Sequence, residues 1–272
     1  MSGLQIAFKK FSPRLGIWGS PWVGFGNFTK FFSSYMFSRV LGNTLTISLY
    51  SLVAGFPTPI LLALMLNSML NQRYKRFIQT ITYIPHFISV VVMVGILLQM
   101  LNPRIGVAAI GFRKLFGREM TDLFAQPNAF ANLYVWSGIW QGIGWGSIIY
   151  IAALSSIDPE LHEAAQIDGA SRVGRIWHID LPGLMPTAII LLILNTGSIM
   201  NVGFEKVFLM MNDLNVRSSE VISTYVYKVG LAANRVDYSF ATAIGVFNSV
   251  VNFLLIVSVN AISRRVSETS LW

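Results

Sequence analysis

Long apolar runs separated by shorter polar segments dominate the pattern of the chain. Five runs hold roughly 20 mostly apolar residues each, the length that a helix rising about 1.5 Å per residue needs to cross about 30 Å of hydrocarbon. None of the five contains Asp, Glu, Lys or Arg. The predicted spans are Asn43–Met69, Ile78–Leu101, Asn132–Leu154, Pro186–Phe204 and Ser239–Ile262.

The polar segments between these runs differ in character. Residues 70–77 are predicted to form a short basic turn, whereas 102–131 and 205–238 are longer and rich in helix-breaking residues. Residues 155–185 mix five acids with two arginines. The first 42 residues contain Gly, Pro and aromatic residues but no long apolar run, which predicts an interfacial or folded segment outside the membrane.

Composition supports a membrane protein. Apolar residues make up 54% of the 272 positions and charged residues only 12%, about half of the ~25% that is usual in soluble domains. The net charge is +8, but the basic residues are spread between apolar runs, which favours membrane-flanking loops over a nucleic-acid-binding surface. The absence of cysteine excludes disulfides, thiolate metal sites and a cysteine nucleophile.

Orientation does not follow from the basic residues. One side of the membrane would hold 70–77, 155–185 and the C-terminal tail, with seven Lys and Arg, and the other side would hold thirteen. The second side is also far longer, so number and density point in opposite directions, and the positive-inside rule leaves the orientation open.

The motifs that are missing narrow the function. The sequence has no phosphate-binding loop, so ATP hydrolysis by this chain is not expected, and it has no zinc-protease or nucleophile-elbow motif. His86 is the one residue within the spans that titrates near neutrality, and we expect it to have a structural hydrogen-bonding role. A stand-alone secondary carrier or channel, and a structural membrane anchor, remain alternatives to a transporter subunit.

The third predicted span is rich in glycine and tryptophan. Gly138, Gly142 and Gly146 recur every four residues, with Gly144 beside them, which predicts close packing against a neighbouring helix. Three tryptophans on the same helix are also expected to pack, although interfacial anchoring or sugar stacking would suit them: Trp136, Trp140 and Trp145.

Residues 155–185 carry the clearest local signals. Asp158 before Pro159 is typical of a helix start, and two glutamates follow near the positive end of the helix dipole. Gly169 is expected to end this helix and Pro182 to end a second one. The segment is therefore predicted to be two short helices joined at a glycine. Together they would present a rigid polar surface suited to binding a partner protein.

The same segment resembles the E-A-A-x3-G-x9-I-x-L-P loop of binding-protein-dependent ABC importer permeases. The neighbourhood is similar to the carbohydrate-uptake, maltose-type branch, and within it to the oligosaccharide/polysaccharide LplB-like subgroup. The loop match comprises Glu163, Ala164, Ala165, Gly169, Ile179, Leu181 and Pro182. Further matches lie at 16–24, 43–45, 84–85, 88–89, 202–205, 224–227, 243–245 and 271–272.

This resemblance implies an all-α integral membrane protein with the helical bundle of a type I ABC importer permease. The E-A-A loop would be cytoplasmic and form coupling helices in a groove of the ATPase subunit, with Glu163 pairing with a basic ATPase residue. Asp168 and Gly169 would shape the bend between the helices. The implied partners are a second permease, two ATPase subunits and an extracytoplasmic solute-binding protein that delivers a carbohydrate. No cofactor or metal is implied.

The resemblance also implies an orientation in the bacterial cell membrane. With 155–185 inside, residues 1–42 form an extracytoplasmic or interfacial segment, 43–262 form the permease domain, and 263–272 form a cytoplasmic tail. Relatives usually carry another span before the segment equivalent to Gly3–Phe11, so we expect the natural start to lie upstream, rather than a five-span protein with an outside N-terminus.

The translocation path is expected to be polar and uncharged, which suits neutral sugars or sugars recognised mainly outside the membrane. Four asparagines in or beside the last two spans are candidates to line it, although hydrogen bonds between helices would explain them equally well. They are Asn195, Asn201, Asn248 and Asn252.

Overall fold

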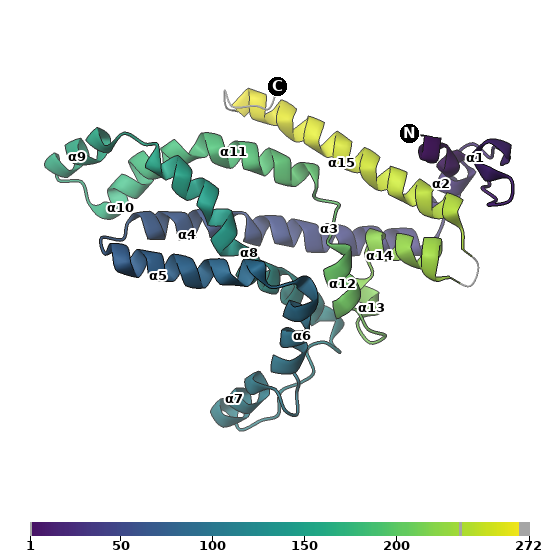
Figure 1. The fold of residues 1–272 in the computed structure, drawn as a ribbon, viewed down its shortest axis with the longest axis horizontal. Helices are drawn as coiled ribbons and strands as arrows, with labels where there is room; N and C mark the ends of the chain where they lie inside the picture. The colour runs from purple at the N-terminus through teal and green to yellow at the C-terminus, as the bar shows by residue number, and fades with distance from the viewer. Residues whose placement is uncertain (1, 234–235, 267–272) are drawn as a thin grey trace. The chain divides into compact units, whose positions relative to one another are not determined.

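The computed structural model describes residues 2–233 and 236–266, and these form helices and turns without any β-strand. One isolated antiparallel bridge joins Lys9 and Trp22. The longer helices, traced in order in Figure 1, are α3 (Tyr35–Gly55), α4 (Pro57–Asn67), α5 (Gln72–Tyr83), α6 (Val90–Met100), α7 (Val107–Phe116), α8 (Phe130–Ser155), α9 (Pro159–Ile167), α11 (Leu181–Gly197) and α15 (Tyr238–Val266).

Shorter helical segments complete the chain. The α-helical ones are α1 (Gly16–Gly19), α2 (Gly26–Phe32), α10 (Arg172–Arg175), α12 (Phe204–Met210), α13 (Val216–Ser219) and α14 (Ile222–Tyr227). The 3-10 turns are η1 (Ser2–Phe8), η2 (Ile84–Phe87) and η3 (Pro127–Ala129), and the π-helical turns are η4 (Ile176–Asp180) and η5 (Lys228–Ala232).

Among the described residues, three helical stretches are long and apolar enough to cross a membrane: Tyr35–Asn67, Arg172–Gly197 and Tyr238–Arg264. The first and last of these stretches overlap most of the first and fifth predicted spans, whereas Arg172–Gly197 overlaps the fourth only over 186–197, and an interrupted helix pair would make a fourth stretch. The third predicted span is α8, a helix of 26 residues without a charged side chain. Its glycines, serines and tryptophans make it less apolar than the other three.

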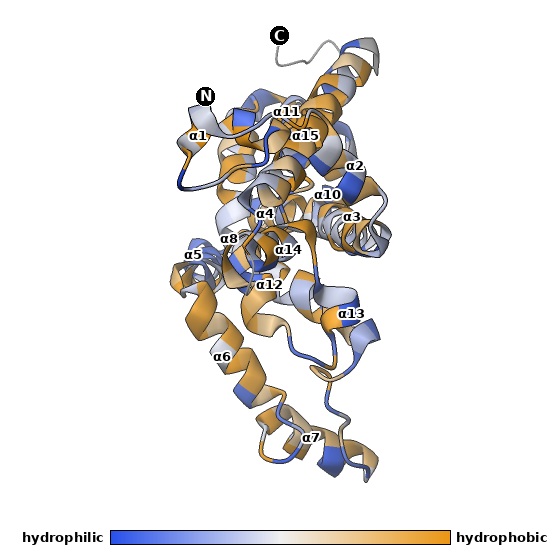
Figure 2. Cartoon of the chain, turned by 90° about the vertical axis from the view of Figure 1, so that its right-hand side faces the viewer, coloured by the Kyte–Doolittle hydropathy of each residue, from blue (hydrophilic) through white to orange (hydrophobic). Residues whose placement is uncertain are grey.

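The second predicted span is interrupted. A single helix over Ile78–Leu101 was expected, but α5 passes into the 3-10 turn η2, and α6 begins only at Val90. Pro85 lies in η2, where it lacks the N–H of an α-helical hydrogen bond, and the backbone leaves helical geometry at Ile88, with φ −76° and ψ 128°. Figure 2 shows that α6, beyond the break, is predominantly apolar.

The prediction of a basic turn over 70–77 is wrong from residue 72 onward, because α5 begins at Gln72. The Asn71 side chain accepts hydrogen bonds from the backbone N–H groups of Arg73 at 3.0 Å and Tyr74 at 3.2 Å. Such an N-cap satisfies donors that the first helical turn leaves unpaired. The basic residues therefore lie on the first turns of a helix.

The chain divides into two compact units, which we describe separately. Unit 1 comprises Met1–Leu49, Val90–Tyr134 and Ser198–Leu254, and unit 2 comprises Tyr50–Ser89, Val135–Gly197 and Leu255–Trp272. In unit 1, Ala7 and Phe28 of the N-terminal segment pack with Ala243 of α15. The core of unit 2 joins three helices, α4, α8 and α11, through Ala63, Leu64, Tyr150, Leu154, Leu184 and Ala188.

Close packing of α8 in unit 2 confirms the role predicted for its glycines, with a change of residue. Gly144, which lies outside the four-residue repeat, is so close to α5 that a Cβ atom would overlap the Thr82 carbonyl group. A Cβ at Gly146 would lie 3.1 Å from Pro59 Cγ, whereas one at Gly142 would meet nothing within 4 Å. The closest approach of the backbones is therefore at Gly144.

His86 is held by stacking. Its ring lies parallel to that of Trp145, with the ring centroids 4.5 Å apart and the planes 2° apart. A second tryptophan of α8, Trp136, donates a hydrogen bond from Nε1 to the Tyr50 hydroxyl at 2.8 Å. His86 is thus a packing residue, as expected, but its described contacts are with aromatic rings rather than hydrogen-bonding partners.

Candidate functional site

The start of α9 has the predicted cap. Asp158 Oδ1 accepts a hydrogen bond from the backbone N–H of Glu160 at 3.0 Å, and Pro159 occupies the first helical turn, where its missing N–H costs nothing. The acid in the first turn also lies near the positive end of the helix dipole. These local interactions fix the direction in which α9 leaves the end of α8.

Gly169 separates α9 from α10. Its φ of +79° lies in the left-handed region, which a residue with a Cβ adopts only with strain. On the next turn, Ser171 Oγ accepts a hydrogen bond from Gly174 N at 3.1 Å and caps α10. Residues 158–175 therefore form two short helices joined at a glycine, as the sequence predicts.

The second helix does not end at Pro182. Helical backbone runs without a break from Arg172 to Gly197. The π-helical turn η4 comes immediately before α11, and Pro182 falls in the first turn of α11. A π turn shifts the hydrogen-bond pattern from i−4 to i−5, an irregularity of the kind that accommodates a proline within a helix. The short helix α10 is thus continuous with a membrane-spanning helix.

The outer surface of α9, α10 and η4 combines acids with exposed apolar side chains. Glu163, Ala164 and Asp168 are exposed. Ile167 is 87% exposed, one helical turn after Glu163. Three other large apolar residues of this surface are more than half exposed: Leu161, Val173 and Trp177. Apolar side chains ringed by charges are typical of a protein-docking surface.

The remaining residues of the loop motif are covered to different degrees, and two of them, Gly169 and Pro182, are exposed. Ile179 belongs to η4 and is half-buried, while Ala165 is partly covered. Leu181 packs against the core formed by α4, α8 and α11. The two halves of the motif therefore differ: one presents a surface, and the other anchors that surface to α11.

A buried polar contact, which the sequence did not predict, joins these halves. His162 Nε2 lies 3.3 Å from Asp180 Oδ1, and the Asp180 side chain is only 7% exposed. Asn67, at the end of α4, reaches the same carboxylate oxygen at 3.5 Å. His162 and Asp180 are 18 positions apart in the sequence, and no spacing rule brings them together.

Three of the four candidate asparagines meet in unit 1. Asn201 Oδ1 accepts hydrogen bonds from Asn248 Nδ2 at 2.9 Å and Asn252 Nδ2 at 3.1 Å. Asn252 Oδ1 in turn accepts from the backbone N–H of Met200 at 3.0 Å. Asn195 belongs to unit 2 and is exposed. These hydrogen bonds join α15 to the non-helical segment between α11 and α12 rather than two helices, and pore lining remains a prediction.

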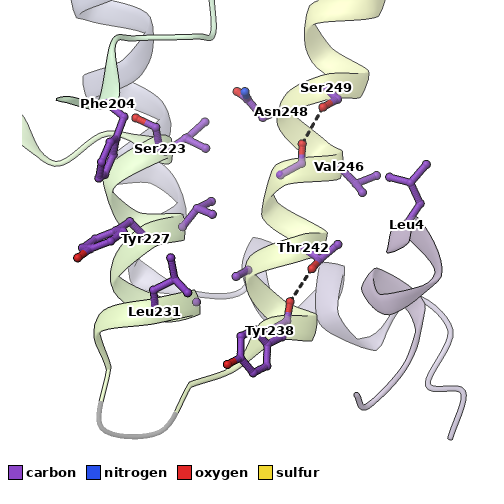
Figure 3. Close-up of a pocket in the computed structure, with 15 residues that line it drawn as sticks. Leu4, Phe204, Ser223, Tyr227, Leu231, Tyr238, Thr242, Val246, Asn248 and Ser249 are labelled. Atoms are coloured by element: carbon purple, nitrogen blue, oxygen red, sulfur yellow. Dashed lines mark hydrogen bonds between the residues drawn. The ribbon is translucent and has the colours of Figure 1, made fainter. Parts of the chain in front are cut away.

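Asn248 also borders a cavity of about 670 Å³ in unit 1, between α14–η5 and α15 (Figure 3). Phe204, Tyr227, Leu231 and Tyr238 contribute apolar surface. Hydroxyl groups on α15 are used within that helix: Thr242 Oγ1 donates to Tyr238 O at 2.7 Å, and Ser249 Oγ donates to Gly245 O at 3.0 Å. The cavity is therefore mainly apolar, with Asn248 at one edge.

A second cavity in unit 1, of about 1010 Å³, is basic. Its charged lining residues are Lys10, Lys30, Lys228 and Asp237. Lys30 Nζ pairs with Asp237 Oδ2 at 2.8 Å, and Lys228 Nζ pairs with the buried Glu220 at 3.3 Å. Within the part of the chain that the structure describes, no acid forms an ion pair with Lys10.

Aromatic residues share this second cavity, which we call the lysine cavity. They come from the N-terminal segment, α3, α14 and α15: Phe11, Tyr35, Tyr225 and Phe240. Aromatic faces and cationic side chains together suit sugar rings that carry negative charge. The sequence did not predict this site, because its lining comes from segments about 200 positions apart.

Lys206 of α12 is a buried lysine outside the spans. Its Nζ donates to the Tyr134 carbonyl oxygen at 2.6 Å and lies 4.4 Å from the centroid of the Tyr134 ring. Burial disfavours the charged form and lowers the pKa of Lys206 from 10.5 to about 8. The amine remains mostly charged at neutral pH, where these two contacts stabilise it.

Comparison with known families identifies the family to which this fold belongs. Residues 55–268 match the family described as binding-protein-dependent transport system inner membrane component. The chain belongs to this family. It is a membrane permease of sugar ABC transport rather than an enzyme, and its apolar helices agree with an inner-membrane location.

Individual relatives of the permease are similar over its full length. Protein LplB of Bacillus subtilis (strain 168) is 42% identical over 272 residues, which are 100% of this chain and 85% of the relative. The polygalacturonan/rhamnogalacturonan transport system permease protein YteP of the same organism is 39% identical over 274 residues, covering 100% of this chain and 84% of YteP.

A solved structure has the same fold. It is the crystal structure of a bacterial alginate ABC transporter in complex with an alginate pentasaccharide-bound periplasmic protein. One of its chains matches with a TM-score of 0.90 and 40% sequence identity, over 99% of this permease and 88% of that chain. The type I importer permease fold expected from the sequence is therefore confirmed.

Proposed function

We propose that this permease imports an oligosaccharide in an ATP-driven complex and docks a separate ATPase through the surface of α9, α10 and η4. The complex would also contain a second permease, in a heterodimer, and an extracytoplasmic solute-binding protein. The observation that carries the proposal is the helix–glycine–helix unit, which exposes Glu163 and Ile167 while its end continues directly into α11.

The proposal assigns an orientation. With the docking surface in the cytoplasm, α5 begins on the cytoplasmic side and the C-terminus is cytoplasmic as well. The lysine cavity, built from residues before 37 and from 225–240, then opens on the extracytoplasmic side. Substrate released by a binding protein would meet this cavity before the membrane.

Reconstitution tests the proposal against a stand-alone carrier or channel. The permease and its partner subunits are placed in proteoliposomes with the binding protein and a radiolabelled oligosaccharide. We expect uptake only when the ATPase subunits and ATP are present. Uptake by the permease alone, without an ATPase, would support the carrier alternative and contradict the proposal.

For the substrate, we propose an oligosaccharide that bears carboxylates. The four charged side chains of the lysine cavity comprise three lysines and one aspartate, and the Lys10 amine is available to a ligand. A second solved structure similar to this chain is that of a bacterial ABC transporter involved in the import of the acidic polysaccharide alginate, which agrees with this choice. The uncharged path within the spans then suits sugars that are selected outside the membrane.

Replacing Lys10 by glutamate is expected to reduce uptake of tri-galacturonate by ~10-fold, the lower end of the effect of electrostatic steering. Uptake of its fully methyl-esterified analogue, which has the same size and no charge, should change little. Lys10→Arg should retain uptake of both probes. Lys114→Glu makes the same charge change at an exposed position of α7 and serves as the control. Equal losses for the charged and neutral probes would contradict a role in binding carboxylates.

A further inference from the structure

A face of α9 next to its docking surface contacts the helix that continues into α11. His162 Nε2 and Asp180 Oδ1 are 3.3 Å apart, with 25% and 7% of the two side chains exposed. His162 precedes Glu163 in the sequence, so the two side chains leave the helix about 100° apart. One points to the partner surface and the other into unit 2.

Donors surround the Asp180 carboxylate. His162 and Asn67 contact the same oxygen, and Arg172 and Arg175 line the adjoining pocket of about 260 Å³. A neutral His162 with its proton on Nε2 donates to Asp180, and a protonated His162 adds an ion pair. A buried carboxylate lowers the stability of the folded chain unless it has hydrogen-bonding partners. Pairing with His162 is therefore favourable for Asp180.

Among the described residues, this contact is the one hydrogen bond or ion pair that joins α9 to residues 171–181, and otherwise the chain is continuous through the backbone around Gly169. That joint has a glycine at φ +79°, a position where the chain can bend with little steric resistance. Without the contact, a displacement of α9 would be absorbed at the joint. The contact between His162 and Asp180 links α9 to α11 without passing through the joint at Gly169. Asp180 is the last residue of η4, and α11 begins at the next position.

We propose that His162 and Asp180 are positioning residues that transmit movement of α9 to α11. The pair moves the two elements together, and α11 carries the movement into the core of unit 2 through Leu184 and Ala188. This inference rests on the proposed function, since it requires that an ATPase displace α9. It assigns a mechanical role to two residues outside the seven matched positions of the loop motif.

The test measures the amount of tri-galacturonate imported per ATP hydrolysed by the complete transporter in proteoliposomes. Asp180→Leu and His162→Leu break the contact, whereas Asp180→Asn keeps an oxygen that accepts from His162. We expect each leucine variant to lower the ratio at least ~5-fold, the lower end of the coupling usually carried between two sites. Asp180→Asn should stay close to the parent, and the double leucine variant should be no worse than the poorer single variant.

A structural role alone would reduce the amount of assembled transporter without changing the ratio in what remains. An unchanged ratio in both leucine variants would therefore overturn the inference, and so would the failure of both to assemble. Glu163→Lys distinguishes a failure of this inference from a failure of the proposed function. If it disrupts ATPase binding while His162→Leu leaves the ratio intact, only the inference fails; if it leaves ATPase binding and transport normal, the proposed function fails.

Discussion

Glu163→Lys is expected to release the ATPase from the permease and abolish ATP-dependent uptake, while the membrane helices remain inserted. Glu163 is exposed on α9, so the substitution disturbs no packing within the chain. In the proposed complex its carboxylate pairs with a basic residue of the ATPase. Losing one member of such a buried pair typically costs about 2–5 kcal/mol of binding free energy, and lysine adds repulsion.

Co-purification of the ATPase with tagged permease, followed by uptake in proteoliposomes, measures this effect. Glu119→Lys is a matched control, because it makes the same charge change at another exposed position, in the segment predicted to lie outside the cell. The control should bind the ATPase and transport normally. Normal transport by the Glu163→Lys variant would remove Glu163 from the docking contact.

The helix–glycine–helix unit of α9 and α10 could be predicted from the sequence because its signals are local. Asp158, Pro159 and Gly169 act on backbone groups within a few positions, and each has the expected effect in the structure. The rule for Pro182 is local as well, but it was wrong here. The π-helical turn before Pro182 lets the helix continue, and residue preferences do not reveal such a turn.

The path of the apolar runs was harder to predict than their existence. Apolarity determines whether a segment can lie in a membrane, but it does not determine where its backbone bends. The second run was therefore expected as one helix, whereas the backbone leaves helical geometry at Ile88, immediately after η2. Apolarity likewise placed the fourth span at 186–204, whereas helical backbone ends at Gly197.

Sites that depend on tertiary structure could not be predicted at all. The contact between His162 and Asp180 and the lysine cavity bring together residues with no common spacing. The asparagines were identified by polarity alone. Only the structure shows that three of them hydrogen-bond in one cluster in unit 1 and that Asn195 lies in unit 2, because the partners of an amide are set by how the chain packs.

Gly144→Ala is expected to have the largest effect on stability. The added methyl group would overlap the Thr82 carbonyl and approach Tyr83 Cδ1 to 2.9 Å, so α8 and α5 must move apart. Overpacking of a well-packed interior typically costs about 1–3 kcal/mol, and here part of the obstacle is backbone, which cannot rotate away as a side chain does. The loss should exceed the ~1 kcal/mol that alanine gains over glycine in a helix.

Gly142→Ala is the matched control, since it lies on the same helix, has the same chemistry and meets nothing within 4 Å. It should keep or slightly raise the temperature at which the detergent-solubilised permease aggregates, because only the gain in helix propensity applies. Gly144→Ala should lower that temperature and reduce the amount of protein in the membrane. If both variants behaved alike, the close approach of α8 to α5 would be wrong, since helix propensity affects the two positions equally and only the distance to Thr82 separates them.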